Sequence, residues 1–464
     1  MVPATGQWKC SLPTWAAQQW VALRQDAADT WPGEEPLGPH WQGQVMQRLE
    51  AFAAALDWED SQAFVGQMLW AAQAARNRGQ SEGPLLHRTD QALYQSKNQR
   101  RNRVTAAPCN PWTPMDIHSK PRAQRIDWLF ERARDHSARF CSPEIWLARE
   151  RYLALHPTAI GVLKCMDGRI NIPVATHTPL GIIHLFRNLG GMFDLGWPHL
   201  GEVLAGYVQR CVREGRRVLL LITYHFSRGS VHRGCAGFHG DTAAAIEHTR
   251  RIKQQVETVF GQGRDTVYPV LCGFETDEDA LLVHGEQGGL LDLAQCAGMA
   301  EDALAQHLAA LFPDMPRQMR DDLLPLLAGN LRRIDEVRQM HRAADIEHRE
   351  WMICLGRGFD FLHMPNIALI VGPYSPELAE PVGQAAAIIE ANMAKGRIPD
   401  DGFLLLASVP YEELGVDSAR AGLKSAFLAD FAAGVIARQS PALAGKMHVR
   451  TAVLDWRSRR LEPV

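Results

Sequence analysis

Short apolar segments alternate with helical patterns from residue 158 onward, and this alternation limits the fold more than any other feature of the sequence. Helical patterns at 198–213 and 241–260 separate some of the apolar segments, and Asp241 or Thr242 can cap the second helix. Nearly continuous apolar strands between amphipathic helices predict a mostly parallel sheet covered on both faces. The predicted strands of this α/β fold span residues 158–164, 181–186, 217–224, 267–274 and 280–284.

A second, shorter alternation follows a helical stretch at residues 300–344. It repeats the order of elements of the first one, with helices predicted at 376–394 and 417–438. Residues 365–464 contain no cysteine and a single histidine, His448. We therefore expect a degenerate, metal-free second copy of the first fold. Its predicted strands span residues 367–371, 403–408 and 448–456.

The chain before the first alternation has a helical pattern. An apolar stripe runs between residues 45 and 56, and tryptophans at helical spacing are expected in a helical core rather than in a ligand site. The basic run at 97–103 and the prolines after it predict a solvated linker, with a docking patch for an acidic partner as the alternative. Helices are also predicted at 123–136 and 143–155. The predicted domains are a helical one with this linker at 1–150, a catalytic one at 151–362 and the second copy at 363–464.

Composition and charge restrict the classes of function. The chain has 464 residues, of which 46% are hydrophobic and 22% charged, so it is long enough for two or three globular domains. A formal net charge of -3 gives no general reason to expect nucleic acid or an anionic membrane as a partner. We find no signal peptide and no apolar run long enough for a membrane span, and we expect a cytoplasmic protein. Nine scattered cysteines indicate reduced thiols, some of which can bind a metal.

Ligating side chains follow two of the predicted strands. Cys165 comes directly after the first strand, His225 ends the third, and Cys235 lies in the stretch that follows. Neighbouring parallel strands would bring these residues to one edge of the sheet. Two thiolates and one imidazole fill three of the four positions around zinc and leave the last for water, whose pKa falls from about 15.7 towards 7. The pattern predicts a zinc-dependent hydrolase or hydratase.

Asp167 and Arg169 follow Cys165 at alternate positions. Asp167 could either bind the zinc or accept a hydrogen bond from a zinc-bound hydroxide. Arg169 can hold that carboxylate in a bidentate pair, which keeps the carboxylate ionised and away from the metal. An ordinary surface ion pair after a buried cysteine is the alternative interpretation.

Several motifs together resemble the carboxysomal (carboxysome shell-associated) carbonic anhydrases, a divergent branch of the β-class. The motifs are Cys-Met-Asp-Gly-Arg at 165–169, Gly-Gly-Met-Phe-Asp at 190–194, Tyr-His-Phe at 224–226, Gly-Cys-Ala at 234–236, Gly-Phe-Glu-Thr-Asp-Glu-Asp-Ala at 273–280 and Gly-Arg-Gly-Phe-Asp at 356–360. The resemblance runs in order from about residue 158 to the C-terminus. It implies a β-carbonic-anhydrase-like fold with a degenerate second copy.

The resemblance also implies the chemistry. Cys165, His225 and Cys235 would hold Zn2+, and Asp167 with Arg169 would form a catalytic dyad that acts on CO2 and bicarbonate through a zinc-bound hydroxide. The histidine matching His348 would reach the active site from outside the first group of strands. His232 competes with His225 as a ligand, because His232 and Cys235 have the His-x-x-Cys spacing of ordinary β-class enzymes. We prefer His225, since a residue at a strand end is better fixed than one in a Gly-rich loop.

The expected partners follow from the same resemblance. It implies a homodimer or a higher homo-oligomer in the cytoplasm, and a contact with a carboxysome shell or Rubisco if the enzyme is enclosed in a carboxysome. Two other functions stay open from the residues alone. One is an inactive scaffold or binding protein with a structural zinc, and the other is a zinc hydrolase that acts on another small electrophile.

Overall fold

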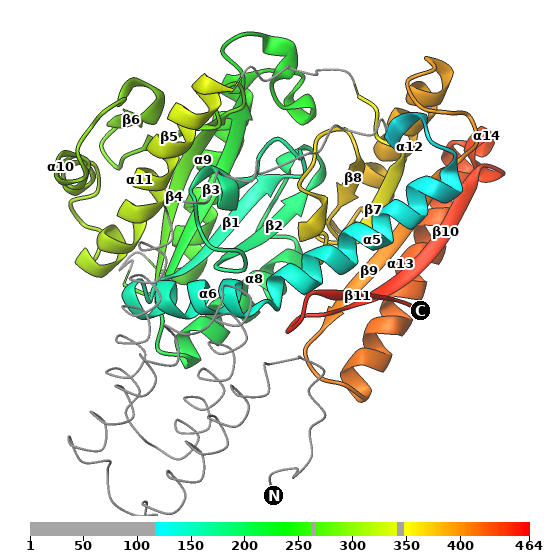
Figure 1. The fold of residues 1–464 in the computed structure, drawn as a ribbon, viewed down its shortest axis with the longest axis horizontal. Coiled ribbons are helices and arrows are strands. Elements are labelled where there is room, and N and C mark those ends of the chain that lie inside the picture. Colours follow the sequence, from blue (N-terminus) through cyan, green and yellow to red (C-terminus); the bar gives the residue numbers. More distant parts are fainter. Residues whose placement is uncertain (1–116, 262–264, 341–347) are drawn as a thin grey trace, which may run out of the picture. The chain divides into compact units, whose positions relative to one another are not determined.

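The computed structural model describes residues 117–261, 265–340 and 348–464 (Figure 1). The apolar stripe at 45–56, the tryptophans before residue 78 and the basic run at 97–103 lie outside the described residues. Two helices precede the first strand, α5 (Arg122–Phe140) and α6 (Pro143–Leu155). Both were predicted in nearly these positions. The start of α6 is set by Ser142, whose hydroxyl accepts a hydrogen bond from the Ile145 amide at 3.3 Å, and by Pro143 in the first turn.

The first sheet has six strands in the order β2-β1-β3-β4-β5-β6. The first four strands in that order are parallel, β5 pairs antiparallel with β4, and β6 pairs antiparallel with β5. This confirms the mostly parallel sheet expected from the first alternation. The strands are β1 (Ala159–Cys165), β2 (Ile183–Asn188), β3 (Val218–Phe226), β4 (Val267–Glu275), β5 (Ala280–His284) and β6 (Leu290–Asp292).

Helices cover both faces of the first sheet. Leu163 and Leu220 pack on one face against α8 and α9, whereas Val162 and Leu221 point to the other face, in the core that includes α10 and α11. Alternate residues of a strand point to opposite faces, so a sheet buried on both faces needs apolar residues at nearly every position. The helices are α7 (Ile172–Ala175), α8 (Pro198–Arg213), α9 (Thr242–Phe260), α10 (Glu301–Leu311) and α11 (Arg317–Gln339).

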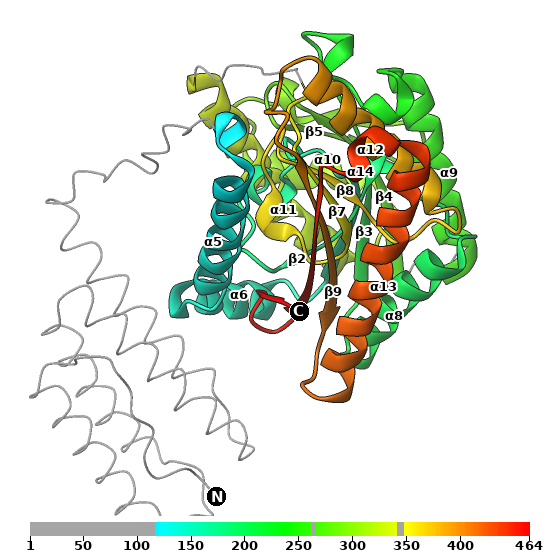
Figure 2. The same ribbon diagram turned by 90° about the vertical axis from the view of Figure 1, so that its right-hand side faces the viewer.

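The second sheet has five strands in the order β11-β10-β9-β7-β8. Figure 2 shows α13 on one side of this sheet and α5 on the other. Every helix within the described ranges is too short or too polar to pass through a lipid bilayer. The elements are β7 (Met352–Gly356), β8 (Ala368–Val371), α12 (Ala379–Ala394), β9 (Phe403–Tyr411), α13 (Val416–Gln439), α14 (Pro441–Ala444), β10 (Met447–Asp455) and β11 (Arg460–Pro463).

The two mostly parallel sheets share one strand order, because β8, β7, β9, β10 and β11 hold the places of β2, β1, β3, β4 and β5. The turn that precedes β5 and the turn that precedes β11 also agree in detail. Asp279 before β5 and Arg459 before β11 both have positive φ, at 55° and 57°. The amide of Thr276 donates to the Phe226 carbonyl and that of Trp456 to the Tyr411 carbonyl, each at 2.9 Å. The second copy expected from the sequence is therefore present, and β6 has no counterpart in it.

The sheets meet at their edge strands β2 and β8. Arg187 in β2 donates to the Phe359 carbonyl at 2.8 Å and to the Met166 carbonyl at 2.7 Å. Asn188 accepts a hydrogen bond from the Gly372 amide at 3.0 Å. Arg187 and Asn188 are both buried. The ends of β1 and β2 are thus fastened to the second half of the fold.

Three strands were not predicted: β6, β7 and β11. The apolar run that forms β7 is only five residues long and ends at Gly356, so its length alone did not distinguish it from a loop. Because β7 pairs with β8 and β9, the second sheet begins at Met352, ahead of the predicted boundary between residues 362 and 363. The three predicted domain ranges remain predictions.

Candidate metal centre and active site

Cys165, His225 and Cys235 come from three segments of the first half. Cys165 is the last residue of β1, and His225 is the second-to-last residue of β3, which pairs with β1. Because the two strands are parallel neighbours, their ends bring a thiol and an imidazole to the same edge of the sheet. Cys235 lies in the connection from β3 to α9, between two short 3-10 turns.

The ligating atoms of these three residues all lie within 4.8 Å of one another. The residues are buried, and neither ring nitrogen of His225 has a hydrogen-bond partner. A buried polar group without a partner costs about 1–3 kcal/mol, and a bound cation would remove that cost. Among the residues that the structure describes, no other group of three metal-binding side chains is as close. Two thiols and an unpaired imidazole match the donor set of zinc.

The two thiols influence each other's ionisation. The neighbouring Cys235 lowers the pKa of Cys165 well below its usual value, although burial acts in the opposite direction. The same contact, together with burial, raises the pKa of Cys235. A metal ion between the two sulfurs would stabilise both as thiolates.

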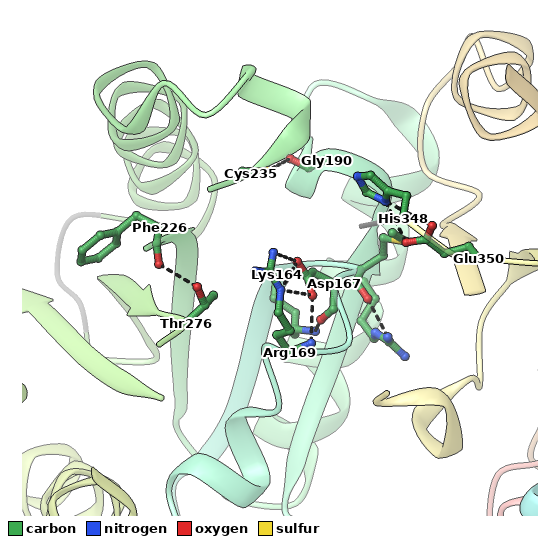
Figure 3. A network of polar contacts seen from close by, with 11 residues as sticks. Lys164, Asp167, Arg169, Gly190, Phe226, Cys235, Thr276, His348 and Glu350 are labelled. Atoms are coloured by element: carbon green, nitrogen blue, oxygen red, sulfur yellow. Dashed lines mark hydrogen bonds and ion pairs between the residues drawn. The ribbon is translucent and has the colours of Figure 1, made fainter. Parts of the chain in front are cut away.

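Glycines allow the segment with Cys235 to approach the strand ends. A Cβ on Gly237 would lie 2.6 Å from the Cα of Gly190, too close for any residue with a side chain. Gly191 has φ of 68°, and a Cβ there would lie 3.5 Å from the Cβ of Cys165. The Cys235 thiol donates to the Gly190 carbonyl at 3.3 Å, as Figure 3 shows. The Gly-Gly pair is therefore more than a turn, because both cysteines pack against it.

Asp167 and Arg169, which follow Cys165 in the chain, form a multiply bonded pair (Figure 3). The guanidinium Nη2 of Arg169 lies 2.6 Å from Oδ2 of Asp167, Nε contacts both carboxylate oxygens at 3.1 and 3.2 Å, and the Arg169 amide donates to Oδ1 at 2.9 Å. Burial alone would raise the pKa of Asp167, but the charge of Arg169 outweighs it and holds that pKa below its usual value. The side chains are only 18% and 22% exposed, so the pair differs from an ordinary surface ion pair.

Residues 155–296, which span every strand of the first sheet, match the family model described as the carboxysome shell carbonic anhydrase, catalytic domain. Residues 155–296 are thus similar to a carbonic anhydrase catalytic domain. This match confirms the resemblance that the motifs indicate, and it supports interconversion of CO2 and bicarbonate as the activity. The scan of curated proteins gives no match. Among solved structures the chain is similar to the beta-carbonic anhydrase CcaA, with 13% identity over 37% of this chain and 91% of that chain and a TM-score of 0.24.

The second half of the fold contributes to the wall of the candidate site. A cavity of about 470 Å³ is lined by residues of both halves. From the first half come Cys165, Asp167, Arg169 and His225, and from the second half come residues near β8 and on α12. His232 lines the same cavity but is absent from the group of three close ligating residues. The structure thus brings His225, and not His232, to the two cysteines.

Gly168, within the Cys-Met-Asp-Gly-Arg motif, lies against the second half. A Cβ at this position would be 2.0 Å from the carbonyl oxygen of Met364. No residue other than glycine fits without a shift of one backbone or the other. The segment that carries Asp167 and Arg169 is therefore held between the two halves of the chain.

His348 lies at this cavity, next to β7 in the chain. Its Nδ1 is 3.0 and 3.1 Å from the two carboxylate oxygens of Glu350. This contact raises the pKa of His348 above its ordinary value. The structure thus places His348 in the wall of the cavity, with a carboxylate partner, and its role in the reaction stays a prediction.

Two buried residues with titratable side chains near the candidate site were missed from the sequence, Glu350 and Lys164. The side-chain nitrogen Nζ of Lys164 donates to the Asp167 carbonyl at 3.2 Å, and burial, reinforced by nearby Arg187, lowers the pKa of Lys164 well below its usual value. A lysine inside an otherwise apolar strand was the available signal for it. Cys272 and Cys354 are buried core thiols, and burial raises the pKa of Cys272 to about 12.

Proposed function

We propose that this domain holds one zinc ion through Cys165, His225 and Cys235 and uses it to interconvert CO2 and bicarbonate. The observation that carries the proposal is the buried group of three donors, in which both nitrogens of the His225 ring lack a partner. Zinc, when bound, lowers the pKa of a coordinated water and so supplies a nucleophile near neutral pH. The family match favours CO2 over another small electrophile as the substrate.

Asp167 and Arg169 would orient the reacting groups. Four N–H···O contacts from Arg169 hold the carboxylate, so Asp167 stays ionised and its position is determined. An ionised carboxylate beside the ligand group accepts a hydrogen bond from a proton-bearing nucleophile and thereby turns a lone pair towards CO2. Because its oxygens are engaged by Arg169, Asp167 would not close the zinc site as a fourth ligand.

Metal analysis of the purified full chain, combined with stopped-flow CO2 hydration, tests the proposal. We expect close to one zinc per chain, loss of hydration when a chelator removes the metal, and recovery when zinc is restored. A chain free of zinc that hydrates CO2 at full rate would rule out the metal site. A chain that holds zinc but has no hydration activity would favour a structural role for the metal.

A homo-oligomer is the assembly that the chain's surface supports best, with α13 as its contact. Four large apolar residues, one just before this helix and three in its first half, are strongly exposed: Leu414 (84%), Val416 (78%), Leu423 (74%) and Phe427 (69%). The spacing of the last three places them on one side of the helix, and burying such a stripe against a second copy would stabilise a homodimer. Arg420 and Asp430 lie on the same side of α13, so an antiparallel pairing of two copies of the helix would set opposite charges against each other.

Enclosure in a carboxysome is proposed from the family match alone. Fractionation of cells that express the full chain, followed with an antibody against it, distinguishes the two locations within the cytoplasm. Sedimentation with shell particles would support enclosure, and recovery in the soluble fraction would support a free cytoplasmic enzyme.

A further inference from the structure

His348 and Glu350 form a close pair at the wall of the cavity, as Figure 3 shows. The two residues differ sharply in exposure, since the His348 side chain is 44% exposed and that of Glu350 is 5% exposed. Both line the cavity that also contains Cys165 and Asp167. The imidazole therefore borders both the site and the solvent, whereas its carboxylate partner is buried.

Glu350 is itself anchored from behind. The side-chain amide of Asn392, on α12, donates to the Glu350 carbonyl oxygen at 3.1 Å and approaches its Oε2 at 3.5 Å. Asn392 is 1% exposed, and the strand β7 begins two residues after Glu350. The carboxylate thus has a determined position before any substrate binds.

From this geometry we infer that Glu350 is a positioning residue for proton transfer, acting through His348, an inference that rests on the proposed function. When Glu350 is ionised it accepts the Nδ1–H of His348, which fixes the neutral ring in one tautomer and leaves Nε2 as the acceptor. Nε2 can then take the proton that CO2 hydration releases in the cavity, and the imidazolium can pass it to buffer. Because the carboxylate is buried, water does not compete with His348 for this hydrogen bond.

The charges around His348 come from three segments. Glu350 stabilises the imidazolium most strongly, Asp167 adds to that effect, and Arg397 opposes it. Removal of the Glu350 charge therefore lowers the pKa of His348, whereas Asp167 and Arg397 keep their places. The midpoint of the pH profile of kcat for hydration should then move to lower pH, because the neutral ring is the proton acceptor.

Glu350→Gln in the full-length zinc-loaded enzyme tests the inference. In this scheme, proton transfer to buffer limits kcat and follows the steps that determine kcat/KM. At low buffer concentration, we expect kcat to fall by about 10- to 100-fold with kcat/KM within about twofold of the original value. Added imidazole should restore kcat, and Glu350→Asp, which keeps a carboxylate, should retain most of it.

A double-mutant cycle separates positioning from a structural role. In a His348→Ala background, Glu350→Gln should cause no further loss of kcat if Glu350 acts through His348. An equal loss in both backgrounds, or an equal fall in kcat/KM, would overturn the inference. His348→Ala is a second test, because the His348 ring is partly exposed and its removal is less apt to disturb folding than a change at buried Glu350. Unchanged kcat of His348→Ala at low buffer concentration would also overturn the inference.

Glu380→Gln is the matched control, because Glu380 lines the same cavity but has Gln384 as its hydrogen-bond partner. Its kcat should stay within about twofold of the unmodified enzyme. Failure of the proposed function would show differently, as absent hydration in the unmodified chain.

Discussion

β3 and β9 hold the same place in their sheets, but the connections that leave them differ in length. Residues 227–241 connect β3 to α9, whereas residues 412–415 connect β9 to α13. Cys235 lies on the longer connection. The shorter one has no room for a corresponding loop, so the second copy lacks the segment that supplies the third donor.

The strand ends differ as well. When β3 and β9 are aligned on their last residues, the strand pairing places Arg357 where Cys165 stands and Pro410 where His225 stands. A guanidinium and a proline cannot replace a thiolate and an imidazole as metal ligands. The second half thus has the strand order of the first but no metal-binding side chain at any of the three ligand positions.

Aromatic and cationic side chains pack at the corresponding place in the second half. The guanidinium of Arg459 lies 3.5 Å from the centroid of the Trp456 ring, and that of Arg357 lies 5.7 Å from it. His184 stacks on Tyr207 with ring centroids 4.6 Å apart and is 5.3 Å from Trp456. Cation–π contacts and ring stacking stabilise this region in place of a metal. The same topology therefore supports a ligand site in one half and, in the other, a half-buried aromatic and cationic cluster to which β2 and α8 of the first half contribute His184 and Tyr207.

Cys165→Ser tests whether the metal site belongs to the first half alone, and it has the largest expected effect on activity. Zinc content should fall from about one per chain to near zero, and CO2 hydration should drop by more than about 1000-fold, because the site loses a thiolate ligand. Cys354→Ser, on β7 of the second half, is the control and should retain zinc. The assignment fails if Cys165→Ser keeps full activity, or if both variants lose metal equally.

Asp167→Asn should have the next largest effect. An amide of the same shape is uncharged, so we expect retained zinc with kcat reduced by about 100- to 10,000-fold in stopped-flow assays. Asp360→Asn, in the segment after β7, should leave kcat within about twofold. An unchanged rate for Asp167→Asn would contradict the role of this carboxylate.

Gly168→Ala tests whether the second half supports the first. A new Cβ would lie 2.0 Å from the Met364 carbonyl, so we expect the free energy of unfolding to fall by about 1–3 kcal/mol in denaturant titrations. The matched control is Gly206→Ala on α8, where a Cβ meets no atom within 4 Å. That variant should be more stable by about 0.5–1 kcal/mol, since alanine favours a helix. Equal effects at both positions would show that the approach of Met364 is unimportant.

Phe427→Asp should have the smallest effect on turnover. We expect light scattering to show a smaller assembly at the same chain concentration, with kcat per zinc nearly unchanged, because α13 lies in the second half. Gln254→Asp, at an exposed position on α9 of the first half, is the control. An assembly that resists Phe427→Asp would place the contact between copies elsewhere.

Much of the fold could be predicted from the sequence because helices cover both faces of the sheets. Strands buried in this way are apolar at nearly every position and stand out in the sequence. Helix α8 and strand β5 have the predicted limits, since long amphipathic and continuous apolar patterns depend on local periodicity. The strands β6 and β11 were missed because their sequences, Leu-Leu-Asp and Arg-Leu-Glu-Pro, carry little apolar pattern, and β7 was missed although it is as long as β5. Glu350 was missed because its partner Asn392 is distant in the chain.

The sequence by itself determined the order of strands and helices, the repeat, and the residue types able to bind zinc. Only the tertiary structure decided which histidine joins the cysteines. Parallel pairing of β1 and β3 brings the end of one strand beside the end of the other, and therefore His225 meets Cys165 whereas His232 does not. Tertiary structure also decided that the second half walls the cavity, because the edge strands β2 and β8 meet and Met364 packs on Gly168. Contacts of this kind depend on how distant segments pack, which local sequence patterns do not encode.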